Sequence, residues 1–276
     1  MKLATIREGG RTLAVRIDGD EAVELDAADV GQILRRPGWR AWAASARGAV
    51  RPAAGLDYAP LVPAPDKIVC VGLNYRSHIL EMGRELPEHP TLFAKFRQAL
   101  VGARDDIVLP AAAEQVDWEA ELAVVVGARV RHATVEGARA AIGGYAVLND
   151  VSVRDYQYRT LQWLQGKTFE STTPLGPWLV TPDESPGPSR EVTCEVAGEP
   201  VQKGDTADLV FDPPTLVAYV SSIVTLEPGD VIATGTPGGV GAARTPPRFL
   251  AEGDTVVTRI EGLGECRNDC RREQIG

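Results

Sequence analysis

Cysteine and histidine are both scarce in this sequence. The 276 residues include three histidines and four cysteines, which are Cys70, Cys194, Cys266 and Cys270. Four scattered thiols are too few for the disulfide framework of a small secreted protein. The C-x3-C spacing at the last two suggests a metal site, but no other cysteine or histidine lies near them in the sequence. We therefore expect free thiols in a protein of the reducing cytoplasm.

Long apolar runs and an excess of basic residues are also absent. No apolar stretch approaches the ~20 residues of a membrane-spanning helix, and the first residues, MKLATIRE, lack the apolar segment of a signal peptide. Lys and Arg number 29 against 38 Asp and Glu, for a formal net charge of −9. Because phosphate backbones and anionic membranes bind to basic surfaces, we expect neither nucleic acid nor a membrane as a partner.

The chain is long enough for two domains of unequal size. Hydrophobic residues make up 44% of the sequence, which suffices for a packed core. Residues 1–60 combine strand-like and helix-like segments, which predicts a small N-terminal α+β domain. The proline-rich stretch 59–65 sustains neither a helix nor a central strand, so we expect a linker there and a second domain over 66–276.

Short strands dominate the predicted second domain. Helical patterns are fewer, and they cover residues 135–141, 153–164 and 214–222. Many short strands with few helices favour a β-rich α+β roll or sandwich over a doubly wound parallel sheet.

Acidic residues stand at two strand-like positions. Glu119 and Glu121 lie two apart on one predicted strand and therefore point to the same face. Two carboxylates buried side by side repel each other, and a divalent cation with oxygen ligands, such as Mg²⁺, Mn²⁺ or Ca²⁺, relieves the repulsion. Asp150, at the end of another apolar strand, would complete a set of three. Taken alone, an E-x-E pair fits a solvated strand face better, and Asp150 or Ser152 also fits a helix cap.

One histidine has a carboxylate in a suitable position. If Ser77 caps a short helix, Glu81 lies three residues after His78 on the same face. A carboxylate beside an imidazole fixes its tautomer and raises its basicity, as in a general base. A surface His–Glu pair is the simpler explanation for these two residues alone. His89 and His132 have no such context and are expected in exposed turns.

Two further segments carry polar residues that suit an active site. Arg154 and Gln157 fall one helical turn apart, which would direct both side chains toward the same opening of an active site. The alternative for Arg154 is an ion pair on the surface. Gly-Lys-Thr at 166–168 resembles the end of a phosphate-binding loop, but position 161 lacks the required glycine and no strand precedes it. Lys167 is thus a candidate for holding a substrate carboxylate or enolate. The glycine-rich turn 233–241 fits either an anion cradle or a structural turn.

Together these segments resemble the fumarylacetoacetate hydrolase family from about residue 67 to 260. The resemblance rests on six motifs in order: Val-Gly-Leu-Asn-Tyr with His78, 91–95, 116–127, 144–155, 166–178 and 234–241. It implies a mixed β-roll, a homodimer and a small N-terminal domain. Residues 96–98 differ from the version common in many members, which leaves the substrate preference open. The region 70–72 lacks an aspartate that some members use as a ligand, so three protein ligands are expected.

The resemblance also implies roles for particular residues. It assigns Mg²⁺ or Mn²⁺ to Glu119, Glu121 and Asp150. It implies catalysis by His78, Glu81 and Lys167, with substrate binding by Arg154, Gln157 and Thr236. Lys95 corresponds to a lysine usual in the family.

The expected activity follows from the same resemblance. It is a metal-dependent hydrolysis of a C–C bond in a 2,4-dioxo acid of the acylpyruvate or fumarylpyruvate type, in which the His–Glu pair activates water. The same site would serve decarboxylation or tautomerisation of a 2-oxo diacid, of the oxaloacetate or 2-hydroxyhepta-2,4-dienedioate type, without attack by water. A binding module without turnover is the third alternative.

Overall fold

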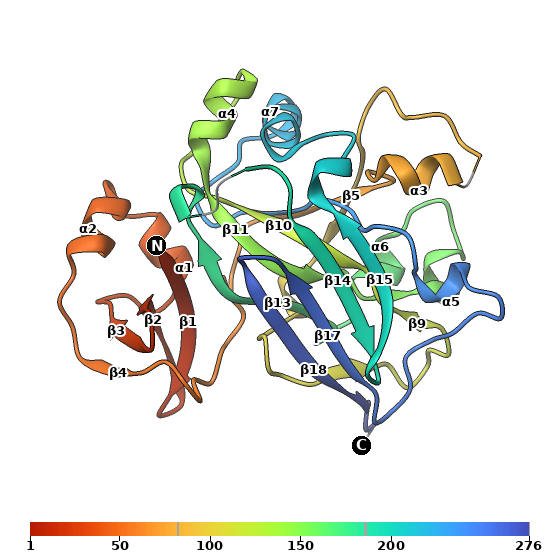
Figure 1. Cartoon of the computed structure of the whole chain (residues 1–276), viewed down its shortest axis with the longest axis horizontal. Coiled ribbons are helices and arrows are strands. Elements are labelled where there is room, and N and C mark those ends of the chain that lie inside the picture. The colour runs from red at the N-terminus through yellow and green to blue at the C-terminus, as the bar shows by residue number, and fades with distance from the viewer. Residues whose placement is uncertain (82, 185–186, 276) are drawn as a thin grey trace.

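Strands make up most of the regular structure of the protein, as the sequence predicts (Figure 1). A computed structural model describes residues 1–81, 83–184 and 187–275. The strands are β1 (Lys2–Glu8), β2 (Arg11–Asp18), β3 (Glu21–Glu24), β4 (Val50–Pro52), β5 (Ile68–Gly72), β6 (Thr91–Lys95), β7 (Leu100–Val101), β8 (Ile107–Leu109), β9 (Val116–Asp117), β10 (Ala120–Val126), β11 (Ile142–Asn149), β12 (Ser152–Val153), β13 (Thr173–Val180), β14 (Glu191–Val196), β15 (Glu199–Asp205), β16 (Val231–Ala233), β17 (Thr255–Ile260) and β18 (Gly264–Arg272). The helices are α1 (Val30–Leu34), α2 (Trp39–Ser45), α3 (Arg76–Glu81), α4 (Val135–Ala141), α5 (Arg154–Gln157), α6 (Leu164–Lys167) and α7 (Pro213–Ile223).

Two mixed sheets build the molecule. The larger has the order β4-β3-β2-β1-β13-β11-β10-β16-β5-β6, with β7 beside β13. The smaller has the order β15-β14-β17-β18-β8, and β9 and β12 form a separate pair. Most neighbours are antiparallel, while β16 runs parallel to β5, β18 parallel to β8 and β13 parallel to β7. The β-rich α+β class with mixed strands is therefore confirmed.

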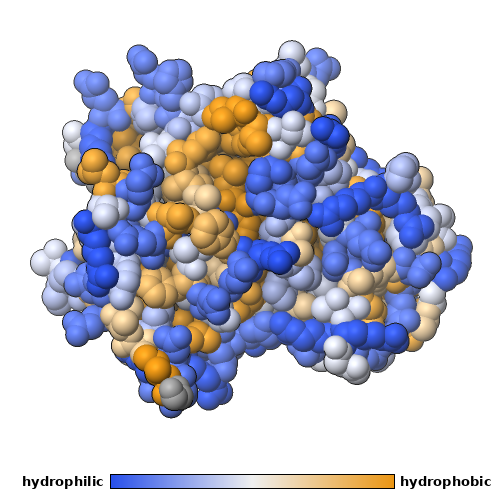
Figure 2. All heavy atoms as spheres, turned by 180° about the vertical axis from the view of Figure 1, so that it is seen from behind, coloured by the Kyte–Doolittle hydropathy of each residue, from blue (hydrophilic) through white to orange (hydrophobic). Residues whose placement is uncertain are grey.

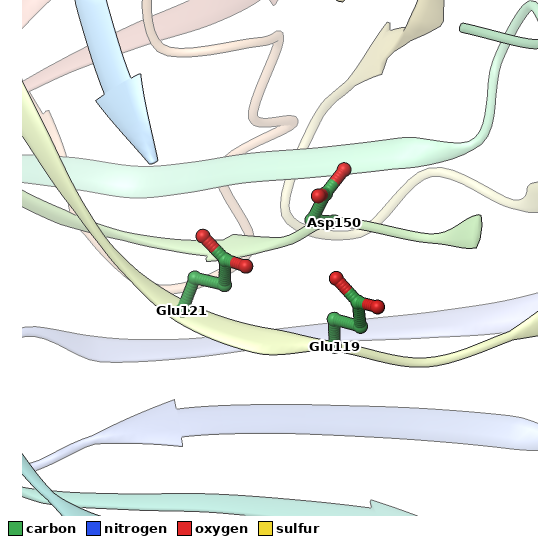
Figure 3. Close-up of side chains that lie close together, drawn as sticks. All are labelled: Glu119, Glu121 and Asp150. Atoms are coloured by element: carbon green, nitrogen blue, oxygen red, sulfur yellow. The ribbon is translucent and has the colours of Figure 1, made fainter. Parts of the chain in front are cut away.

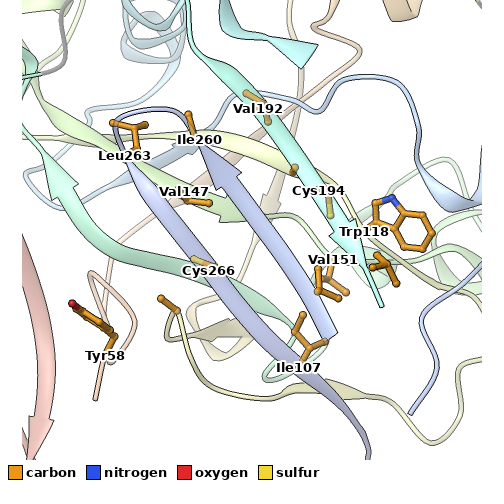
Figure 4. Packing of buried hydrophobic residues seen from close by; sticks show 14 of the residues in the cluster. Tyr58, Ile107, Trp118, Val147, Val151, Val192, Cys194, Ile260, Leu263 and Cys266 are labelled. Atoms are coloured by element: carbon orange, nitrogen blue, oxygen red, sulfur yellow. The ribbon is translucent and has the colours of Figure 1, made fainter. Parts of the chain in front are cut away.

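The core lies where the two sheets face each other. Strand β10 has the sequence AELAVVV, and all seven of its residues are buried because it lies between β11 and β16 in the large sheet. Apolar side chains of both sheets meet in one cluster, including Val147 of β11 and Cys194 of β14 (Figure 4). Trp118 is fully buried at the edge of this cluster, next to the start of β10. The apolar strand pattern thus places β10, with Glu121, in the middle of the protein.

The N-terminal strands continue the large sheet. Lys2 and Leu3 of β1 pair with Val180 and Leu179 of β13. In Figure 1 the elements from β1 to β4, with α1 and α2, lie on one side of the molecule. The domain boundary near residues 60–66 stays a prediction.

One predicted helix is wrong. Residues 153–164 were expected to form a single helix, but α5 ends at Gln157 and α6 begins at Leu164. In the intervening turn, the Thr160 hydroxyl accepts a hydrogen bond from the Gln162 N–H at 3.3 Å and donates to the Gln162 carbonyl at 3.0 Å. Such local side-chain bonds compete with the helical hydrogen bonds of the backbone. The two short helices then pack closely, because a Cβ on Gly166 would lie only 2.5 Å from the backbone nitrogen of Gln157.

All four cysteines are free and buried. Within the described residues, no helix has the length and apolar character needed to cross a membrane. Figure 2 shows apolar side chains gathered in a band on the face opposite that of Figure 1. A band of this kind often marks an interaction surface, and the homodimer stays a prediction.

Candidate active site

Three carboxylates meet beside the large sheet. Each of Glu119, Glu121 and Asp150 offers an oxygen that lies within 4.8 Å of the others, and all three residues are buried (Figure 3). Glu119, which was predicted to lie on the same strand as Glu121, immediately precedes β10, and Asp150 immediately follows β11. The cluster that the sequence predicts as a metal site is thus a real cluster in the fold.

Strand pairing explains why these residues come together. Ala120 of β10 is paired with Asn149 of β11, so the residues just before and just after this pair are neighbours. The Asp150 N–H donates to the Glu119 carbonyl at 2.8 Å, and the Glu119 N–H donates to Asn149 Oδ1 at 2.9 Å. The register of two buried strands therefore holds the acids close together despite their repulsion.

Two buried lysines hold Asp150. Lys95 Nζ lies 2.7 Å from one carboxylate oxygen, and Lys167 Nζ lies 2.8 Å from the other. Burial by itself would raise the pKa of Asp150, but the charges of Lys167 and Lys95 lower it to about 2. Lys167 also contacts Glu119 at 2.6 Å, and these two acids raise the pKa of Lys167 despite its burial. Lys167 therefore stays charged beside the carboxylates.

Glu121 has a different environment. Its carboxylate accepts a hydrogen bond from the Gly235 N–H at 2.8 Å, and among the described residues no side-chain cation pairs with it. Burial, together with the nearby charges of Asp150 and Glu119, raises the pKa of Glu121 well above its usual value. A buried carboxylate without a cation, beside two more, fits a hard divalent ion with oxygen ligands. The residues present thus suit Mg²⁺ or Mn²⁺ and offer three protein ligands.

Arg154 and Gln157 face the site from helix α5. Arg154 Nη1 donates to Gln157 Oε1 at 2.8 Å, which confirms that both side chains of this helical turn lie together. The guanidinium also contacts Glu119 Oε1 at 2.7 Å and Asp117 Oδ2 at 2.8 Å. Burial opposes the charge of Arg154, but Glu119 and Asp117 raise its pKa. The surface ion pair that was the alternative for this arginine is wrong, because its partners are buried acids.

Asp117 is a site residue that the sequence reading missed. Its carboxylate is fully buried and accepts hydrogen bonds from the backbone N–H groups of Trp118, Gly241 and Ala242, besides its contact with Arg154. It therefore joins the glycine-rich turn to the arginine. The sequence does contain a pattern that identifies it: Asp117 stands two residues before Glu119, just as Glu119 stands two residues before Glu121. On an extended chain all three acids therefore point to the same face.

His78 and Glu81 lie together on helix α3. A Cβ on Gly238 would lie 3.3 Å from His78 Nδ1 and 3.6 Å from Glu81 Oε2, so both side chains are packed against this turn. Between these two described side chains there is no hydrogen bond, and Glu81 acts on the imidazole through its charge. Burial lowers the pKa of His78, while Glu81 and Glu119 oppose the change. His89 and His132 are exposed, as predicted.

Ser77 does not cap this helix. Helix α3 begins at Arg76, and Ser77 lies inside it. The Ser77 N–H and hydroxyl both donate to Asp208 Oδ2, at 3.0 and 2.6 Å. A residue distant in sequence thus takes the place of a local cap and docks the helix that carries His78.

One cavity, with a volume of about 300 Å³, brings the predicted site residues together. Of these residues, Asp150 and Glu81 do not line the cavity, and Asp150 contacts Lys167, which does. The polar residues that line it are His78, Arg84, Glu119, Glu121, Arg154, Gln157, Tyr158, Lys167 and Thr236. Phe93 and Trp163 form an aromatic wall, with ring centroids 5.3 Å apart. A Cβ on Gly72 would lie 2.5 Å from Trp163, so this wall requires a glycine there.

The Thr236 hydroxyl donates to the Ala120 carbonyl at 3.0 Å, which ties the glycine-rich turn to β10.

Comparisons with known proteins agree with this geometry. The model of the C-terminal domain of fumarylacetoacetate (FAA) hydrolase matches residues 67–271. The mitochondrial oxaloacetate tautomerase FAHD2A of Homo sapiens is 47% identical over 218 residues, which are 78% of this chain and 69% of the human protein.

Two solved structures share the fold over almost the whole chain. The 2-hydroxyhepta-2,4-diene-1,7-dioate isomerase of Mycobacterium marinum is 32% identical, with a TM-score of 0.81, and the match covers 100% of both chains. The maleylpyruvate hydrolase of Sphingobium sp. SYK-6, in complex with manganese(II) ion and pyruvate, is 31% identical, with a TM-score of 0.81, over 99% of this chain and 100% of that one. Since the family model spans most of the chain and the carboxylate cluster lies inside the matched region, the protein belongs to the fumarylacetoacetate hydrolase family.

Proposed function

We propose that the protein is a metal-dependent tautomerase of a 2-oxo diacid of the oxaloacetate type. The observation that carries the proposal is a cluster of three buried carboxylates beside Lys167, at a cavity that is also lined by a neutral histidine. Interconversion of an enol and a ketone moves protons between a carbon and an oxygen, and it needs a base together with stabilisation of negative charge on that oxygen. The similarity to the human oxaloacetate tautomerase supports this choice over the other members of the family.

Each residue has a definite part in this proposal. A divalent ion held by Glu119, Glu121 and Asp150 would supply Lewis acidity toward the 2-oxygen of the substrate. His78, neutral at pH 7, takes a proton from carbon 3 of the ketone and delivers it to the 2-oxygen to give the enol, and carries the proton the opposite way in the reverse reaction. The charge of Glu81 sets the basicity of His78. Arg154 and Gln157 orient the 2-oxo carboxylate. Lys167 stays protonated and adds positive charge near the developing enolate.

Hydrolysis of a C–C bond in a 2,4-dioxo acid is the second candidate. The packing of His78 and Glu81 against the same turn favours it, because this pair suits the activation of water. The likeness to the maleylpyruvate hydrolase supports it as well. Tautomerisation and hydrolysis differ in their products, so one assay separates them.

We expect the Mg²⁺- or Mn²⁺-loaded protein to speed the conversion of enol-oxaloacetate to the ketone, without forming smaller acids. The measurement is the loss of enol absorbance, with products identified by NMR, for oxaloacetate and for a set of acylpyruvates. His78→Gln should lower the rate by about 10²–10⁴-fold, as expected for a general base. Release of pyruvate and a second carboxylic acid from an acylpyruvate, with no effect on oxaloacetate, would establish the hydrolase instead.

The pH dependence of the reaction should reflect His78. Burial lowers its pKa below 6.5, and Arg84 acts in the same direction, while Glu81 and Glu119 oppose it. The neutral, active form therefore persists below pH 6.5 and is lost only as the pH falls through the lowered pKa. We expect kcat/KM to decline on the acid side with a midpoint below pH 6.5. The decline should be absent from the residual activity of His78→Gln, and a midpoint above 6.5 in the wild-type enzyme contradicts the assignment.

A further inference from the structure

Arg84 is a cation of the cavity that the buried network does not use. Among the described residues that line the cavity, Arg154 and Lys167 are each paired with buried acids, whereas Arg84 has no ion pair or hydrogen bond from its side chain. It is exposed and lines the same cavity as His78, which places it at the solvent side of that cavity. An unpaired guanidinium at the mouth of a polar cavity is available to an anion.

The charges of the site show why a substrate with two carboxylates needs a cation outside the buried network. The buried network holds four carboxylates, on Asp117, Glu119, Glu121 and Asp150, and three cations, on Lys95, Arg154 and Lys167. A divalent ion would change this excess of one negative charge into an excess of one positive charge. One substrate carboxylate neutralises that excess. A second carboxylate then needs a cation from outside the network, because a buried or half-buried anion without a partner is costly.

The end of helix α3 fixes the position of Arg84. Gly83 has a φ of 66°, the left-handed conformation that glycine adopts most readily. The Gly83 N–H donates to the Leu80 carbonyl at 2.9 Å, and the Arg84 N–H donates to the Ile79 carbonyl at 3.2 Å. This pair of bonds is a Schellman motif, which folds the chain back over the last turn of a helix. The backbone of Arg84 is thus tied to the helix that carries His78.

We infer that Arg84 binds the distal carboxylate of the substrate and makes the site selective for 2-oxo diacids over 2-oxo monoacids. The inference rests on the proposed function, because it takes the 2-oxo carboxylate to be held at the carboxylate cluster. The planar guanidinium suits a carboxylate through two parallel hydrogen bonds. The aromatic wall of Phe93 and Trp163 offers no charge to a distal group, so among the described residues Arg84 is the one that discriminates by charge.

Binding of two unreactive ligands tests this inference without turnover. N-oxalylglycine and N-methyloxamate share the 2-oxo carboxylate group and differ only in the distal carboxylate of the former. In calorimetric titrations of the Mn²⁺-loaded protein, Arg84→Gln should weaken N-oxalylglycine by at least about tenfold. The same variant should leave the Kd of N-methyloxamate within about twofold, and Arg84→Lys should retain part of the preference.

Arg76 provides the matched control. It is an exposed arginine on the same helix and does not line the cavity. Arg76→Gln removes the same charge, so it should leave the Kd of both ligands unchanged.

The other outcomes separate the role of Arg84 from the proposed tautomerase function. An equal effect of Arg84→Gln on both ligands, or an equal effect of Arg76→Gln, overturns the role of Arg84 and leaves the proposed function intact. Failure of the wild-type protein to bind either ligand overturns both. Binding as expected, with no turnover of any 2-oxo acid, overturns the tautomerase and supports a diacid-binding site.

Discussion

Glu121→Gln should abolish activity without weakening the metal-free protein. Glutamine keeps an oxygen for the Gly235 N–H but removes the charge that a divalent ion needs. We expect turnover to fall at least about a thousandfold, which corresponds to loss of the several kcal/mol that a catalytic metal supplies.

The metal-free variant should be at least as stable as the metal-free wild-type protein, although its activity is lost. Because the pKa of Glu121 is raised above that of the unfolded chain, its charged form costs stability at pH values above about 4.5. Glutamine removes this cost, so the Tm of the metal-free variant at pH 7 should not fall. Wild-type protein with Mn²⁺ at about a hundred times its Kd should gain about 5–10 °C, and the variant should lose most of this gain.

Thermal unfolding with and without Mn²⁺, together with the enol-oxaloacetate assay, checks both expectations. Glu136→Gln serves as the control, since Glu136 is exposed on helix α4 and should leave activity and the Mn²⁺ effect unchanged. Full activity of Glu121→Gln after removal of metal by a chelator contradicts the proposed site.

Asp117→Asn should cost the protein more stability than any surface change of charge. The carboxylate accepts from three backbone N–H groups and from Arg154, and an amide has only one oxygen to serve these donors. The variant also leaves the buried guanidinium with less negative charge beside it. Breaking a buried ion pair in this way costs about 3–5 kcal/mol.

Urea denaturation of the metal-free protein measures this loss. The matched control is Asp57→Asn, which breaks the exposed pair between Arg7 and Asp57 at 2.9 Å. An exposed pair contributes about 0–1 kcal/mol, so this control should change little. Equal losses in the two variants would mean that Asp117 does not support the site as proposed.

Local spacing was sufficient to predict much of the candidate site. Glu119 and Glu121 point to one face because they are two apart on an extended chain, and Arg154 and Gln157 meet because they are three apart on a helix. Both predictions needed only the geometry of one element. The single helix expected over 153–164 failed, because helical periodicity does not reveal the competing hydrogen bonds of Thr160.

Local spacing could not predict contacts between residues that are distant in the sequence. Lys167 was expected to face the substrate, and the fold also places it 2.6 Å from Glu119 and 2.8 Å from Asp150. Ser77, which the local pattern offers as a cap for its own helix, instead donates to Asp208, 131 residues away. Nothing in the local pattern of either residue identifies its partner.

By itself, the sequence determined the strand-rich class of this protein, its family resemblance and the acidic residues of one strand face, because apolar alternation and close spacing act within single elements. Only the tertiary structure decided which charges neutralise one another. The register of β10 and β11 brought Asp150 beside Glu119, and two buried lysines pair with Asp150. Among the described residues no side-chain cation pairs with Glu121. The physical reason is that burial makes each charge depend on its nearest neighbours in space, and those neighbours come from distant parts of the chain.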